Sequence, residues 1–84
     1  MTADETLSEF TEILRNLIGD DSIVLTAATR RPDVSGWDSF NYVNFMVAVE
    51  MKFGIKFRVA EVESFQTVGE IATRTLALLD ARRK

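Results

Sequence analysis

Residues 36–57, GWDSFNYVNFMVAVEMKFGIKF, decide the fold of this chain. Asp38 belongs to the residue types that accept backbone N–H bonds at the start of a helix, and Gly54 is the residue that most commonly ends one. The residues between them contain no proline and no further glycine. The pattern therefore predicts one helix from Ser39 to Phe53.

This helix has two apolar stripes, which lie about 160–200° apart at roughly 100° per residue. The stripe predicted to pack on the rest of the protein comprises Tyr42, Met46, Val49 and Phe53. The second stripe comprises Phe40, Asn44, Val47 and Met51. Because the first stripe is sufficient to dock the helix, we expect Phe40, Val47 and Met51 to face solvent and to form a surface for a partner protein.

The composition limits the classes of function. The chain has 84 residues, which predicts a single domain over residues 1–84. Its 13 acidic and 10 basic residues give a net charge of −3, which argues against nucleic acid as a partner. A DNA-binding helix-turn-helix is also disfavoured, because the helix at 39–53 contains one lysine and no arginine.

The chain contains neither cysteine nor histidine. Disulfides, thiolate metal sites and cysteine nucleophiles are thereby excluded, and the commonest general base and metal ligand is missing. We expect no metal site. The first ten residues, MTADETLSEF, are polar and acidic, and no apolar run is long enough to span a membrane. We therefore expect a cytoplasmic protein without a membrane span.

The preceding chain predicts one helix and one long loop. A helical stripe comprises Leu7, Phe10, Leu14 and Leu17, flanked by Ile13 and Ile18, and Gly19 ends it. Residues 20–37 are interrupted by turn-forming residues, and we expect Ile23, Val24 and Leu25 to pack down on the bundle. Trp37 is interpreted as an anchor that fixes how the chain enters the next helix. Arg30-Arg31-Pro32 is interpreted as a turn whose charges aid solubility.

After Gly54 the sequence predicts a short helix at Val59–Ser64 and a last helix from Val68 to Arg82. Thr67 and Glu70 have the spacing of a capping box. The buried side of the last helix is predicted to comprise Val68, Ile71, Ala72, Leu76 and Leu79. Arg82, Arg83 and Lys84 suit the negative end of its dipole. The whole is an all-α bundle with three main helices, one short third helix and a long first loop.

Several motifs follow one another along the chain, namely Asp38-Ser39-Phe40, Val43, Glu50, Phe53-Gly54-Ile55 and Thr67-Val68-Gly69-Glu70-Ile71. They resemble the acyl carrier protein family, whose pattern reads Asp-Ser-Leu, a hydrophobic helix with a Glu, Phe-x-Ile-x-Ile, and Thr-Val-x-x-hydrophobic. They occur in the family's order and with its spacing, over most of the chain.

The resemblance implies that Ser39 carries 4′-phosphopantetheine, whose thiol holds an acyl group as a thioester. The expected partners are a phosphopantetheinyl transferase, an acyl-loading ligase or transferase, and a downstream synthase or acyltransferase, and the carrier itself is a monomer that catalyses nothing. Asp38 is expected to matter for the Mg²⁺-dependent transferase. The positions expected to contact that enzyme are Phe40, Met46 and Glu50, beside the exposed stripe that includes Asn44, Val47 and Met51.

Three alternatives remain open at this stage. Ser39 could serve only as a helix cap together with Asp38, since both are common capping residues. The chain could carry peptidyl or aminoacyl groups, or it could be a carrier-like interaction module without the prosthetic group. Within the helix at 39–53, Glu50 is the only acid, which favours a specialised pathway over general fatty-acid synthesis.

Overall fold

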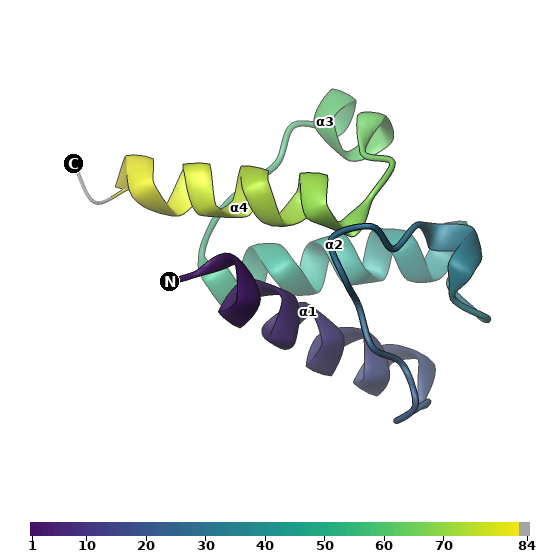
Figure 1. Ribbon diagram of the computed structural model, residues 1–84. Helices are drawn as coiled ribbons and strands as arrows, with labels where there is room; N and C mark the ends of the chain where they lie inside the picture. The colour runs from purple at the N-terminus through teal and green to yellow at the C-terminus, as the bar shows by residue number, and fades with distance from the viewer. Residues whose placement is uncertain (83–84) are drawn as a thin grey trace.

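The computed structural model describes residues 1–82, which fold into helices joined by loops (Figure 1). The elements follow in the order α1 (Ala3–Ile18), the 3₁₀ helix η1 (Arg31–Asp33), α2 (Ser39–Phe53), α3 (Val59–Ser64) and α4 (Val68–Arg82). No β-strand occurs in this range. The predicted all-α bundle, with three main helices, one short third helix and a long first loop, is confirmed.

The inner face of α2 packs on α1 through aromatic rings. Phe10 of α1 makes edge-to-face contacts with Phe45 and Phe53, with ring centroids 5.5 and 5.8 Å apart. The buried residues of α2 are Phe45, Met46, Val49 and Phe53. The predicted inner stripe is thus confirmed for three of its members, while Tyr42 is half-buried. Phe45, which is fully buried, belonged to neither predicted stripe.

The two ends of α2 are capped as predicted. The carboxylate of Asp38 accepts a hydrogen bond from the backbone N–H of Asn41 at 2.8 Å. At the other end Gly54 has φ +66°, a left-handed conformation that L side chains adopt only with strain, and its N–H donates to the carbonyl of Glu50. These caps place Ser39 at the first position of the helix.

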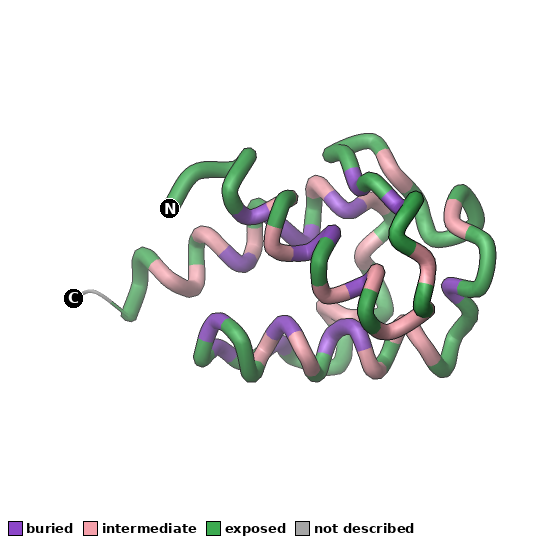
Figure 2. The backbone as a smooth tube through the Cα atoms, turned by 90° about the horizontal axis from the view of Figure 1, so that it is seen from below, coloured by how far each residue is buried: buried purple, intermediate pink, exposed green. Residues whose placement is uncertain are grey.

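The other long helices also turn apolar faces inward (Figure 2). Phe10 and Leu14 of α1 are buried, and the flanking aliphatic residues of the predicted stripe pack against them half-buried. In α4 the buried residues are Val68, Ile71, Ala72 and Thr75. Leu76 and Leu79 are only half-buried, because Thr75 takes the inner position and donates its hydroxyl to the Ile71 carbonyl at 2.8 Å.

The loop at residues 20–37 is packed against the helices. Ile23 and Leu25 are buried as predicted, but the prediction was wrong for Val24, which is 67% exposed. In an extended segment neighbouring side chains point to opposite sides, so Val24 turns outward between them. Trp37 is 4% exposed and packs edge-on against Phe45, with ring centroids 5.2 Å apart. Its predicted role as an anchor is confirmed.

The same loop is bonded to the start of α4. The carbonyls of Thr29 and Ala27 accept hydrogen bonds from Val68 N–H and Gly69 N–H at 2.8 and 2.9 Å. A Cβ atom on Gly69 would lie 2.7 Å from the Ala27 carbonyl oxygen, so the close approach requires glycine. Two of the free N–H groups at this helix end are thereby satisfied by the loop.

The predicted capping box of α4 is present in an altered form. Thr67 Oγ1 accepts from the Glu70 N–H at 3.2 Å, as predicted, but the Glu70 carboxylate accepts from the Gln66 N–H rather than from the Thr67 N–H. At the other end Arg82 donates to the carbonyls of Phe53 and Gly54, at the C-terminus of α2. The predicted roles of Arg83 and Lys84 lie outside the described residues.

Candidate functional site

Ser39 lies exposed at the positive end of the α2 dipole. At this end the Asp38 carboxylate accepts the capping hydrogen bond from the Asn41 N–H. Within residues 1–82 the Ser39 hydroxyl takes part in no hydrogen bond, so the helix start does not depend on it. An exposed, uncommitted hydroxyl at a helix N-terminus is open to an incoming enzyme, and a phosphate attached there would face the favourable end of the dipole.

The chain before Ser39 is held in place by buried and bonded groups. The Asn41 side-chain amide donates to the carbonyl of Gly36 at 2.9 Å. Gly36 has φ +87°, and a Cβ there would come within 3.2 Å of Ile18 in α1. The side chain of Trp37, the next residue, is buried in the core beside Phe45. The turn into α2 is therefore fixed on both sides, which keeps Ser39 pointing outward.

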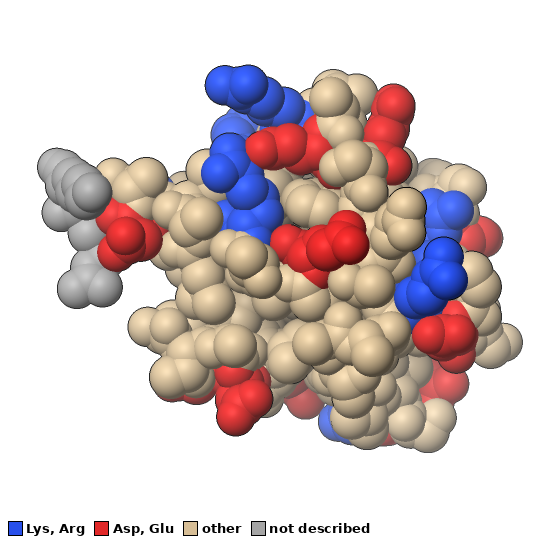
Figure 3. Space-filling view, turned by 45° about the horizontal axis from the view of Figure 1, so that its top comes forward, with Lys and Arg blue, Asp and Glu red and all other residues tan. Residues whose placement is uncertain are grey.

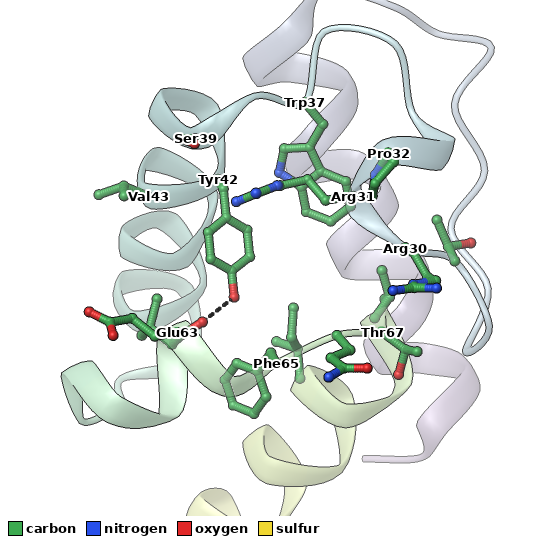
Figure 4. Close-up of a pocket in the computed structure, with 15 residues that line it drawn as sticks. Arg30, Arg31, Pro32, Trp37, Ser39, Tyr42, Val43, Glu63, Phe65 and Thr67 are labelled. Atoms are coloured by element: carbon green, nitrogen blue, oxygen red, sulfur yellow. Dashed lines mark hydrogen bonds between the residues drawn. The ribbon is translucent and has the colours of Figure 1, made fainter.

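A cavity of about 460 Å³ opens beside Ser39 (Figure 4). Its walls come from α2, from the loop at residues 20–37, and from the segment that runs through α3 into α4. The lining residues include Arg31, Trp37, Ser39, Tyr42, Val62 and Phe65. Sequence reasoning did not find this cavity, because its walls are distant in sequence and only the fold brings them together.

The polar groups of the cavity differ in how well they are satisfied. Tyr42 Oη donates to the Val62 carbonyl at 2.6 Å, which ties α3 to α2. Burial raises the pKa of the Tyr42 phenol, while the positive charge of Arg31 acts in the opposite direction. The Arg31 guanidinium lies 5.0 Å from the centroid of the Tyr42 ring. By contrast, Trp37 Nε1 is buried and has no hydrogen-bond partner within residues 1–82.

The exposed stripe of α2 is where the sequence placed it. Phe40, Val47 and Met51 are 75%, 46% and 79% exposed, which confirms the prediction of their exposure. Asn44 is half-buried between them, and Val43, which the prediction left out, is 55% exposed on the same side of the helix. We use the name outward face for Phe40, Val43, Val47 and Met51.

Two of the residues expected to contact the transferase are used within the fold instead. The prediction was wrong for Met46, which is 3% exposed because it belongs to the inner stripe that packs on the bundle. Glu50 is half-buried, and its carboxylate accepts a hydrogen bond from the Phe57 N–H at 2.7 Å. Glu50 therefore holds the chain that leaves α2. Asp38 remains exposed beside Ser39.

On the face in Figure 3 acidic and basic side chains are interspersed, and ion pairs join Lys52 to Glu9 and Arg74 to Glu61 at 3.2 and 2.7 Å. Within residues 1–82 no group of acidic side chains could hold a metal ion. None of the helices described is both long enough and apolar enough to cross a membrane.

A four-helix bundle with an exposed serine at the start of its second long helix defines a small helical carrier domain. The family model for the phosphopantetheine attachment site matches residues 8–75. The acyl carrier protein of Thermotoga maritima is 30% identical over 70 residues, which cover 83% of this chain and 86% of that protein. A holo acyl carrier protein from Geobacter metallireducens, solved by solution NMR, is 36% identical with a TM-score of 0.85, and the match covers 93% of this chain and 90% of that one.

The chain belongs to the acyl carrier protein family. The family resemblance seen in the sequence is confirmed, and with it the function of an acyl carrier whose prosthetic group is 4′-phosphopantetheine. The peptidyl carrier and the unmodified interaction module are not favoured. Carriers of this family are generally non-catalytic and work with synthases and transferases. The residues around Ser39 fit the prosthetic group, because a free hydroxyl and an adjoining cavity are both present.

Proposed function

We propose that Ser39 is the residue to which a phosphopantetheinyl transferase attaches 4′-phosphopantetheine. The observation that carries this proposal is the exposed Ser39 hydroxyl, which makes no hydrogen bond within residues 1–82 while Asp38 caps the helix. When bound, the group supplies a thiol that holds an acyl cargo as a thioester. The protein's own part is to present the serine, position the arm and dock the enzymes.

The test uses a second exposed serine as a matched control. Ser35 lies four positions earlier, outside α2, and is also exposed. The protein, Ser39→Ala and Ser35→Ala are incubated with coenzyme A, Mg²⁺ and a broad-specificity transferase, and intact mass is measured. We expect one phosphopantetheine on the protein and on Ser35→Ala, and none on Ser39→Ala.

Circular dichroism completes this prediction. Because Asp38 provides the cap, Ser39→Ala should keep the helicity of the unchanged protein. Modification that persists in Ser39→Ala would remove the assignment. A large loss of helicity in that variant would instead support a capping role for the serine.

We propose further that the transferase, the loading enzyme and the downstream synthase or acyltransferase dock on the outward face of α2. Large apolar side chains rarely remain exposed together on a small domain without a binding role. The four side chains of the outward face recur along one side of a helix that starts at Ser39. A partner that meets them gains from apolar burial more than from charge, so binding should depend only weakly on salt.

Met51→Glu tests the outward face. Met51 is 79% exposed, so the free energy of unfolding should change by no more than about 0.5 kcal/mol, while acyl loading by the cognate enzyme falls. Val24→Glu is the matched control, since Val24 is also exposed and apolar but lies outside α2, and it should load normally. Severe destabilisation by Met51→Glu, or unchanged loading together with steep salt dependence, would contradict the proposal.

A specialised biosynthetic pathway, such as one for a polyketide or a modified lipid, is the proposed setting. Glu50 is the only acid of α2, and its carboxylate is occupied by the Phe57 N–H. The outward face thus offers no carboxylate to the basic patch of a partner. The mass of the thioester retained on protein from its native host would identify the cargo. A cytoplasmic location stays a prediction, supported by the lack of cysteine.

A further inference from the structure

The cavity beside Ser39 contains a hydrogen-bond donor that the protein leaves without an acceptor. Trp37 is 4% exposed, and its Nε1 atom is buried with no partner within residues 1–82. Buried N–H groups are nearly always paired, because an unpaired one loses its bond to water on folding. Trp37 is therefore an exception that needs a physical reason.

The direction of the indole group links it to the attachment site. In Figure 4 the indole nitrogen lies on the edge of the ring that faces Tyr42 and the start of α2. Trp37 and Ser39 line the same cavity. Packing alone does not explain the tryptophan, since its contact with Phe45 is made by the ring and a phenylalanine could make it without bringing an N–H into the core.

Two other polar side chains in the cavity leave this donor free. The Tyr42 hydroxyl donates to the Val62 carbonyl, and its oxygen accepts no hydrogen bond from Trp37 Nε1 within residues 1–82. Arg31 extends from η1 toward Tyr42 in Figure 4, with its guanidinium 5.0 Å from the ring centroid. The Arg31 side chain is exposed, and it cannot accept a hydrogen bond from Trp37 because a guanidinium group has only donors. It can move aside from a cation–π contact at low cost.

We propose that Trp37 Nε1, with Arg31, binds a carbonyl oxygen of the chain borne on Ser39, so that this carrier holds an oxygen-bearing arm or cargo in the cavity beside α2. The inference rests on the proposed attachment at Ser39. Both side chains offer only donors, and a carbonyl oxygen is an acceptor that both can bind. The oxygen has two possible sources with the same chemistry: an amide of the pantetheine arm or an oxo group of the cargo. A saturated alkyl cargo offers no acceptor beyond its thioester.

The single tryptophan of the chain provides a direct readout, because its indole N–H gives one signal in a ¹H–¹⁵N correlation spectrum. The signal is compared in the unmodified protein, in the protein with the arm and a free thiol, and in the same protein loaded with a saturated chain or with a β-keto chain of equal length. We expect a downfield shift and roughly tenfold slower exchange with water when the acceptor is bound.

The four samples separate the two sources of oxygen. A shift that comes with the arm alone assigns the acceptor to an amide of pantetheine, and a shift seen only with the β-keto chain assigns it to the cargo. An unchanged signal in all four samples would overturn the proposal. A signal already shifted and protected in the unmodified protein would do so as well, because the donor would then have an acceptor without the arm.

Intact mass of the same samples distinguishes failure of this inference from failure of the attachment at Ser39. If the arm is present and the signal stays unchanged, only the inference fails. If no arm is added at Ser39, the proposed function fails, and free pantetheine titrated into the unmodified protein then tests the cavity by itself. No shift of the indole signal in that titration would overturn the inference too.

Variants test the two donors separately. Trp37→Phe keeps an aromatic ring against Phe45 and removes the N–H, so thermal unfolding should change little. The backbone signals of Tyr42 and Val43 should lose the response to whichever group, the arm or the β-keto chain, shifts the indole signal of the unchanged protein. Arg31→Ala should reduce the indole shift in the loaded protein, whereas Arg58→Ala, an exposed arginine outside the cavity, should leave it unchanged. The proposal would be contradicted if the backbone signals of Tyr42 and Val43 behave alike in Trp37→Phe and the unchanged protein, and if Arg31→Ala and Arg58→Ala both keep the full indole shift.

Discussion

At the scale of single residues, Glu50 illustrates how a position expected to meet a partner can instead hold the fold. Its carboxylate accepts the Phe57 N–H at 2.7 Å, and its backbone carbonyl accepts from Gly54 and Ile55. The side chain thus closes the turn that follows α2 and lets Ile55 and Phe57 reach the core. A helical wheel cannot show this bond, because the acceptor and donor lie in different elements.

Replacing Glu50 should separate the two roles. Glu50→Ala leaves the Phe57 N–H without its charged acceptor, so we expect the free energy of unfolding to fall by about 1–3 kcal/mol in urea titrations. Glu50→Gln is the matched control, since it keeps an acceptor oxygen and should lose less. If both variants are as stable as the unchanged protein but lose modification of Ser39, Glu50 acts as an enzyme contact.

Single residues also mark where sequence reasoning was sufficient. Asp38 and Gly54 fixed the ends of α2, because capping depends on local backbone geometry that residue type reveals. Val24 was wrongly predicted to be buried, because it was grouped with its buried neighbours Ile23 and Leu25. Phe45 was missed because a stripe drawn at i, i+4, i+7 and i+11 from Tyr42 omits position i+3, which lies on the same face.

At the scale of elements, the two faces of α2 followed from periodicity, while the place of α3 did not. α3 has only six residues and no fully buried side chain. It is held by contacts with other elements, namely the Tyr42 hydrogen bond to Val62 and the ion pair between Glu61 and Arg74 of α4. Since α3 supplies a wall of the cavity, these contacts control the shape of the site.

The Glu61 carboxylate should make the docking of α3 sensitive to acid. Its pKa is lowered from the ordinary 4.5, mainly by the hydrogen bond from the Arg58 N–H and also by the charge of Arg74. A lowered pKa means that the stabilising effect is complete above the unfolded value and is lost as pH falls through the folded value. We therefore expect the amide protection of α3 to decrease below pH 4.5.

Residue-level hydrogen exchange is the measurement, because Glu5 and Asp20 also have lowered pKa values and would contribute to any global acid transition. Glu61→Gln should remove the acid dependence of the α3 amides. Glu63→Gln, two positions later in the same helix, should retain it. Acid dependence that survives in Glu61→Gln would show that another group controls α3.

At the scale of the whole molecule, the order of the helices was readable from the sequence, but their assembly around the cavity was not. The loop at residues 20–37 reads as an irregular connection, yet Ala27 and Thr29 bond to the first turn of α4, and Arg31 and Trp37 form walls beside Ser39. The two hydrogen bonds to α4 join residues about 40 positions apart, a separation at which local propensity carries no information. Resemblance to a family predicted the prosthetic group, while only the structure revealed the cavity beside Ser39.

Arg82 joins the C-terminal end of α4 to the C-terminal end of α2 and gives a test of the assembled fold. Its guanidinium donates to the carbonyls of Phe53 and Gly54 at 2.9 Å, where the α2 dipole is negative. Arg82→Ala should lower the free energy of unfolding by about 0.5–1.5 kcal/mol, as expected for partly exposed hydrogen bonds. Hydrogen exchange should show the loss concentrated in the last turn of α4.

Gly54→Ala makes this prediction sharper, because it acts on the same contact from the other side. A Cβ at Gly54 would lie 2.7 Å from Arg82 Nη1 and would also strain a backbone with φ +66°. In the Arg82→Ala background the collision is absent, so Gly54→Ala should cost less free energy there than in the unchanged protein. Costs that add within about 0.3–0.5 kcal/mol would mean that Arg82 does not bridge α4 to α2 in solution.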